Sequence, residues 1–103
     1  MIKVSVLYPQ SAGSKFDMDY YVKRHMPMVR QKVGSALKAM AVEQGLSGGQ
    51  PGTAPTYIAA GHLTFESVEA FQAAFGPHTA EIMADIPNYT NIQPIIQIGE
   101  IKM

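Results

Sequence analysis

The first predicted helix of this chain meets a proline within the sequence FDMDYYVKRHMPMV, residues 16–29. Apolar side chains recur there at the spacing of one helix face: Met18, Val22, Met26 and Val29. Pro27 has no N–H to donate, and it disfavours the helical conformation of the residue before it. We therefore expect one helix to end near His25 or Met26 and a second to run from Pro27 to Val33.

Strands are predicted on both sides of these helices, in apolar or alternating runs at residues 2–8, 37–46, 56–65 and 95–103. A further helix is predicted from Val68 to Phe75 behind a Ser67 cap, followed by a short helix through Ile82. The order β-α-β-β-α-β is the ferredoxin-like arrangement, an α+β fold with helices on one face of a four-stranded antiparallel sheet. We expect a single domain over residues 1–103.

The middle of the predicted sheet carries very little charge. The first and third strands are central neighbours in this topology, and across residues 2–8 and 56–65 the only Lys, Arg, Asp or Glu is Lys3. The helices cover one face, and no predicted element is left for the other, which makes it a docking surface. We expect a homodimer in which two sheets pack face to face. The alternative is a monomer whose open face is sufficiently polar through Ser5, His62 and Thr64.

The composition excludes several partners and chemistries. The chain has 8 Lys or Arg and 8 Asp or Glu, a net charge of zero, with no basic stripe, so we expect no nucleic-acid partner. The absence of cysteine rules out disulfides and thiolate nucleophiles. No apolar run is long enough to span a membrane and no signal-peptide core is present, so we expect a cytoplasmic protein without a membrane partner.

His25 is the leading catalytic candidate. It flanks the apolar stripe of the first helix near its C-terminal end, where burial and the helix dipole both act on its pKa, and histidine is the commonest side chain for proton transfer. Asp85 precedes Ile86-Pro87 and is the acidic residue expected to orient the imidazole. The structural alternatives are that His25 bonds a free carbonyl at the proline break and that Asp85 caps a turn.

Other candidates are expected around this pair. An aromatic pocket wall is predicted from Tyr8, Tyr21, Phe75 and Tyr89, with core packing as the alternative role. His62 lies inside the third strand, so it lines either the pocket or the dimer interface, depending on which face meets the helices. The three histidines show no local metal-ligand spacing, so we expect no metal. No dinucleotide fingerprint or phosphate loop is present, and we expect no cofactor.

Three motifs follow one another along the chain: Tyr20-Tyr21 with His25 and Met26-Pro27, then Gly45-Leu46-x-Gly48-Gly49-x-Pro51, then Ala84-Asp85-Ile86-Pro87-Asn88-Tyr89. In this order they resemble the EthD-like family of dimeric α+β barrel proteins, and the resemblance covers nearly the whole chain. It implies a dimeric barrel of facing sheets. It also implies a small-molecule pocket between each sheet and its helices.

The resemblance does not select one reaction, because the wider superfamily includes cofactor-free monooxygenases, isomerases, cyclases, decarboxylases and haem enzymes. We expect a small-molecule-binding protein with cofactor-independent proton-transfer chemistry on a small apolar or aromatic carbonyl compound in catabolism. One alternative is a non-catalytic binding or accessory protein for a partner oxidase. Another is a haem-binding variant, to which only His78 points, because superfamily haem proteins place a histidine on their second helix.

Overall fold

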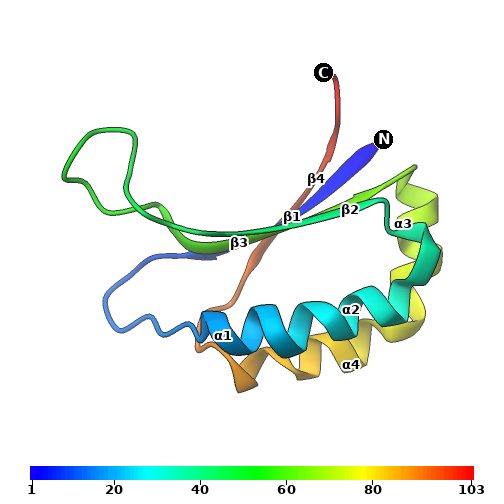
Figure 1. Ribbon diagram of the computed structural model, residues 1–103, viewed down its shortest axis with the longest axis horizontal. Coiled ribbons are helices and arrows are strands. Elements are labelled where there is room, and N and C mark those ends of the chain that lie inside the picture. The colour runs from blue at the N-terminus through cyan, green and yellow to red at the C-terminus, as the bar shows by residue number, and fades with distance from the viewer.

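The computed structural model describes all 103 residues, which form a four-stranded antiparallel sheet with helices on one face (Figure 1). The strands are β1 (Ile2–Pro9), β2 (Ala39–Gln44), β3 (Tyr57–Phe65) and β4 (Ile95–Glu100). The helices are α1 (Met18–Tyr20), α2 (Met26–Val33), α3 (Val68–Phe75) and α4 (Thr79–Ala84), and a π-helical turn, Tyr21–His25, joins α1 to α2. The sheet order is β2-β3-β1-β4, so β1 and β3 are central and the predicted ferredoxin-like fold is confirmed.

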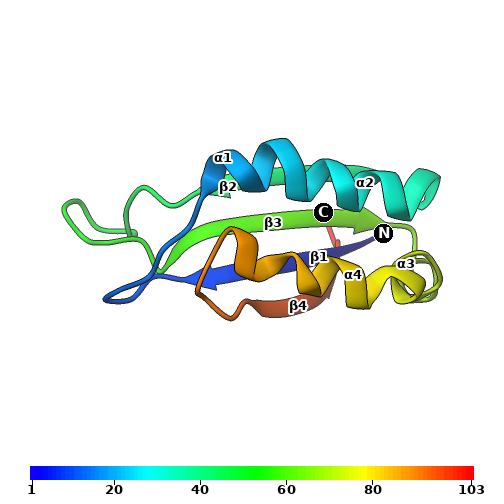
Figure 2. The ribbon, with the colours of Figure 1, turned by 90° about the horizontal axis from the view of Figure 1, so that it is seen from below.

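The helices lie in two rows beneath the sheet. One row consists of α1, the π turn and α2, and the other consists of α3 and α4 (Figure 2). None of these helices has the length and apolar character needed to cross a membrane.

The hydrophobic core lies between the sheet and the helices. Alternate residues of β1 and β3 face the helices, and the register pairs them as Ile2 with Phe65, Val4 with Leu63, and Tyr8 with Ala59. On the helix side, α2 contributes to the core through buried residues that recur at helical spacing: Met26, Val29 and Val33. Burying a large apolar side chain stabilises a fold by roughly 1.5–3 kcal/mol, so this layer holds the helices against the sheet.

The first helix does not end at the proline as predicted. Met26 has helical dihedral angles, φ −66° and ψ −38°, and α2 continues through Pro27 to Val33. The reason is the π turn, in which the Met26 N–H donates to the Tyr21 carbonyl five residues earlier. The wider turn accommodates one additional residue ahead of Pro27. The proline is then the second residue of α2, directly after the π turn, where the regular i→i−4 bonding of an α-helix is already interrupted.

Three strands are shorter than predicted, β3 only by its first residue. β2 begins at Ala39 because a 3-10 turn, Gly34–Ala36, occupies the residues after α2. β4 ends at Glu100, opposite Ile2 at the start of β1, and one further backbone bond follows it, from the Ile101 N–H to the Met1 carbonyl at 3.0 Å.

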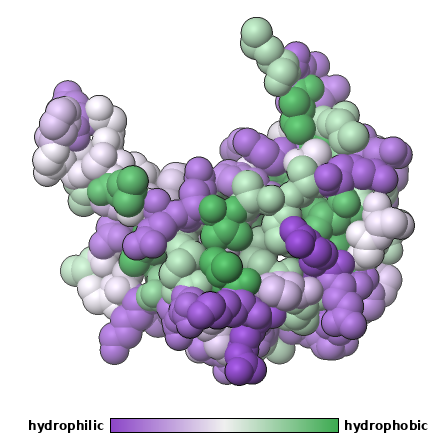
Figure 3. Space-filling model, viewed as in Figure 1, coloured by the Kyte–Doolittle hydropathy of each residue, from purple (hydrophilic) through white to green (hydrophobic).

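No element of the chain covers the face of the sheet that is turned away from the helices (Figure 1). The loop between β2 and β3 and the C-terminal residues rise on that side. The register places Ser5, His62 and Glu43 there, and His62 bonds both neighbours: Nδ1 to Ser5 Oγ at 3.0 Å and Nε2 to Glu43 Oε1 at 2.9 Å. In the same view, Figure 3 shows hydrophobic residues between the sheet and the helices and along the C-terminal segment, and hydrophilic residues over the helices below.

Candidate functional site

The π turn places His25 under the sheet. Tyr21 and His25 are four residues apart on one side of this turn, and both are buried. Their rings lie nearly parallel, with centroids 5.5 Å apart and an interplanar angle of 13°. The hydroxyl of Tyr21 rests on the main chain of β3 at Gly61, where an added Cβ would overlap it. The glycine therefore lets the Tyr21–His25 stack approach the sheet closely.

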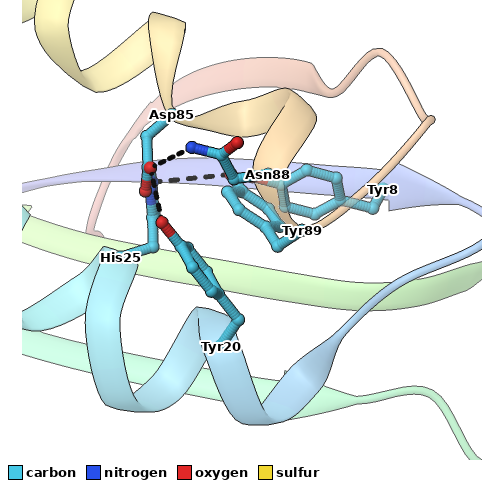
Figure 4. Close-up of polar contacts among 6 residues, drawn as sticks. All are labelled: Tyr8, Tyr20, His25, Asp85, Asn88 and Tyr89. Atoms are coloured by element: carbon cyan, nitrogen blue, oxygen red, sulfur yellow. Dashed lines mark hydrogen bonds and ion pairs between the residues drawn. The ribbon is translucent and has the colours of Figure 1, made fainter.

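Asp85, at the C-terminal end of α4, is hydrogen-bonded to Nδ1 of the His25 ring (Figure 4). His25 Nδ1 lies 2.9 Å from Asp85 Oδ2, while Asp85 Oδ1 accepts from the Tyr20 hydroxyl at 2.7 Å and from Asn88 Nδ2 at 2.9 Å. A carboxylate only accepts hydrogen bonds, so Nδ1 carries the ring proton and Nε2 is left with its lone pair.

The electrostatics of the pair follow from its burial. Burial of the imidazole lowers the pKa of His25, and the hydrogen bond to Asp85 opposes this without reversing it. Burial by itself would raise the pKa of Asp85, but the hydrogen bonds from Asn88, His25 and Tyr20 outweigh it and the pKa lies below its ordinary value. At neutral pH the pair is thus a neutral imidazole and a carboxylate.

The free edge of the His25 ring faces a chain of buried phenols. The Tyr89 hydroxyl lies 3.5 Å from His25 Nε2, which is a weak contact, and 2.7 Å from the Tyr8 hydroxyl. Burial raises the pKa of Tyr8, Tyr21 and Tyr89, so all three phenols stay protonated.

A cavity of about 50 Å³ lies beside these groups, between the sheet and the helices. Tyr8, Tyr21 and His25 line it together with apolar side chains that include Val6, Phe75 and Ile86. Asp85 does not line this cavity; with Tyr20, Arg24 and Glu81 it lines a hollow on the outer surface. The pair therefore spans the wall of the cavity, with the imidazole inside and the carboxylate toward solvent.

Most of the predicted site residues come together in this region. His25 and Asp85 are hydrogen-bonded, and Tyr8, Tyr21 and Phe75 line the cavity. Tyr89 does not line the cavity, but its ring contacts the ring of His25. His62 is the exception, because it lies on the opposite face of the sheet, bonded to Ser5 and Glu43, and so is not part of this cavity. The sequence left open which face of β3 meets the helices. In the structure the large residues Leu63 and Phe65 are buried against the helices, so His62 lies on the other face.

Two residues of the site were not predicted. Tyr20 and Asn88 both donate to Asp85, and neither was singled out as a functional candidate. Asn88 follows Asp85 by three residues, a spacing at which an amide can reach back to a carboxylate across one turn. Tyr20 belongs to the first of the three motifs quoted for the family resemblance, but its contact with Asp85 depends on how the end of α1 lies against the end of α4.

The histidine and carboxylate groups do not form a metal centre. No three or more His, Asp or Glu side chains lie close enough together to hold a metal ion. His78 precedes α4, is half-buried and does not line the cavity.

The comparisons with known proteins agree with this fold and length. The EthD domain model matches residues 11–93, so the chain belongs to the EthD family. An EthD-like protein from Ralstonia eutropha JMP134 is 46% identical, with a TM-score of 0.94 over 99% of this chain and 92% of that one. An ethyl tert-butyl ether D (EthD) family protein from Bacillus halodurans C-125 is 20% identical, with a TM-score of 0.67 over 98% of both chains.

A third similar structure shares the fold at low sequence identity. It is a dimeric protein of unknown function with a ferredoxin-like fold from Bacteroides fragilis NCTC 9343, 12% identical, with a TM-score of 0.61 over 97% of this chain and 95% of that one. Comparison with curated proteins finds no match.

Proposed function

We propose that this protein binds a small apolar or aromatic carbonyl compound in the cavity beneath α2 and transfers a proton with His25, without a cofactor. One observation carries the proposal: His25 lines an apolar cavity, and its Nδ1 is fixed by Asp85 at 2.9 Å, which leaves Nε2 with its lone pair. A neutral imidazole held in one orientation is suited to act as a general base. Isomerisation, cyclisation, decarboxylation and cofactor-free oxygenation of carbonyl compounds all begin with, or include, such a transfer.

Asp85 acts in this proposal as a positioning residue. Its carboxylate fixes the tautomer of His25 and stabilises the imidazolium that forms when Nε2 accepts a proton. Tyr20 and Asn88 hold the carboxylate in place from the outer side.

The alternative is a non-catalytic protein that binds the same kind of compound for a partner oxidase. The cavity serves this role equally well, and the two functions differ only in what His25 does. A haem-binding role is not supported, because His78, the only residue that points to haem, does not line the cavity.

We also propose that the protein is a homodimer, with the open sheet faces of two copies packed together. The support is that this face carries few charges, that its helices cover only the opposite side, and that the dimeric Bacteroides fragilis protein has the same fold.

The catalytic proposal is tested by deuterium exchange. A panel of small carbonyl compounds with a C–H next to the carbonyl is incubated with the protein in D₂O, and exchange at that carbon is followed by NMR. We expect faster exchange for at least one compound. The enhancement should be lost in His25→Gln and kept in His78→Gln, which changes a histidine outside the site. Binding without any exchange in the unmodified protein supports the non-catalytic alternative.

A further inference from the structure

Only three side chains bring polar atoms to the cavity: Tyr8, Tyr21 and His25, while the remaining lining residues are apolar. The proposed function uses His25 and leaves the two phenols without a role. Buried hydroxyl groups in an apolar cavity are costly unless they are paired, and no buried side-chain polar atom of this protein lacks a partner.

The Tyr8 hydroxyl can donate into the cavity when Tyr89 is the donor in the bond that the two phenols share. Its oxygen is 2.7 Å from the Tyr89 oxygen, and either phenol can be the donor in this pair. When Tyr89 donates, the proton of Tyr8 is available to a ligand, and the bond from Tyr89 polarises the Tyr8 O–H further.

The Tyr21 hydroxyl is held in place by its close contact with the sheet. It stands against the backbone of β3 at Gly61, and no other residue type leaves room for it there. The stacking of its ring on His25 fixes the direction of the phenol relative to the imidazole. Both phenols resist ionisation because they are buried, so they remain donors at neutral pH.

We propose that the hydroxyls of Tyr8 and Tyr21 receive the ligand oxygen on which negative charge develops, which makes the ligand an enolisable carbonyl compound. This inference rests on the proposed role of His25 as the base. A base and two neutral donors in one largely apolar cavity are the groups that enolate formation requires, and hydrogen bonds to a developing anion are stronger there than in water.

The step is a balanced proton transfer. His25 Nε2 takes the proton from the carbon next to the carbonyl, and the electrons of that C–H bond form a C=C bond. The electrons of the C=O double bond move to the oxygen, which accepts hydrogen bonds from Tyr8 and Tyr21. The imidazolium then returns a proton to carbon, so no oxidant or reductant is consumed.

The size of the cavity limits how the ligand enters. A volume of about 50 Å³ accommodates the oxygen-bearing end of a molecule, so the rest of an aromatic or apolar ligand has to lie outside it. At its border lie Met83 and Ile96, which are 41% and 50% exposed, together with Ile86 and Pro94. This apolar rim between α4 and β4 suits the body of the ligand, so the favoured compound has a compact carbonyl end and an apolar remainder.

The test uses 4-nitrophenol, whose phenolate oxygen imitates an enolate and whose ionised form absorbs in the visible. The absorbance of the bound probe is titrated against pH in the unmodified protein, in Tyr8→Phe and in Tyr21→Phe, with Tyr57→Phe as the control outside the cavity. A hydrogen bond to a charged group contributes about 1.5–3 kcal/mol. We therefore expect each of the first two substitutions to make the bound probe about 10- to 100-fold less acidic, and the control to leave it unchanged.

Gly61→Ala gives an independent route to the same hydroxyl, because it displaces Tyr21 without removing its phenol. It should reproduce the effect of Tyr21→Phe. A bound probe whose ionisation is the same in all variants contradicts the anion-receiving role of the phenols and leaves the role of His25 standing. A probe that does not bind at all contradicts the ligand cavity itself and, with it, both proposals.

Discussion

His25 and Asp85 are hydrogen-bonded at 2.9 Å, yet they face different environments. The imidazole lines the internal cavity, and the carboxylate lines a hollow on the outer surface. An acid–base pair arranged in this way keeps water away from the reacting side while the charge of the carboxylate stays partly solvated. The side chains are accordingly 5% and 18% exposed.

Asp85→Asn tests the positioning role. The substitution removes the charge that raises the affinity of His25 for a proton, so the pKa of His25 should fall further below its ordinary value. The exchange activity proposed for His25 should fall by about 10²-fold or more. NMR titration of the imidazole measures the first effect. Asp19→Asn, which breaks only the exposed pair with Lys23, is the control and should change neither.

The stability of the protein should fall as the pH is lowered below about 6.5, the ordinary pKa of histidine. His25 has a lowered pKa in the folded state, so the unfolded chain binds a proton first and the folded state loses stability as the pH falls toward the folded pKa. Urea unfolding at pH 7.5 and 5.5 measures the loss. The loss of stability between these two pH values should be smaller in His25→Gln. An equal loss in that variant would mean that other groups cause the pH dependence.

Gly61→Ala should destabilise the fold by about 1–3 kcal/mol, because the new methyl group overlaps the Tyr21 hydroxyl in a packed layer. Combining it with Tyr21→Phe should recover part of that loss, since the overlapping oxygen is then absent. Gly99→Ala, at a glycine with nothing within 4 Å of the added carbon, is the matched control. Equal costs for the two glycine substitutions would contradict the proposed contact.

The homodimer is tested on the open sheet face. Ala41 is exposed on β2 opposite His62, so Ala41→Glu should introduce a charge into the interface and shift the protein to monomers. Ala73→Glu adds the same charge at an exposed position of α3 and should leave the assembly intact. Sedimentation measures both. An unmodified protein that stays monomeric at high concentration would show that a second copy does not cover this face.

Much of the fold could be predicted because it depends on patterns that are local in sequence. Side chains alternate along residues 2–8 and 56–65 as in strands, and apolar residues between and after these stretches recur at helical spacing. Together these patterns predict the observed order of elements. The Ser67 cap is also as expected, since its hydroxyl accepts from the Ala70 N–H. These features need no knowledge of distant contacts.

The geometry of the site could be predicted only in part. The sequence singles out His25 and Asp85, which are hydrogen-bonded in the structure, but the contact of Asp85 with Tyr20 depends on a π turn that no local sequence pattern predicts. The proline rule predicted a break at Met26, because it assumes a regular helix on both sides. The sequence also did not predict whether His62 faces the helices or the open side of the sheet. Strand alternation defines two faces but does not say which one the helices cover.

The π turn has a consequence for how much the chain can vary in length at this point. Each residue of an α-helix advances the direction of its side chains by about 100°. With the additional residue in Tyr21–His25, Tyr20 reaches Asp85 while Val29 still enters the core further along. Deleting one residue would rotate one half of the helix against the other, so either the acid–base pair or the packing of α2 would be misaligned.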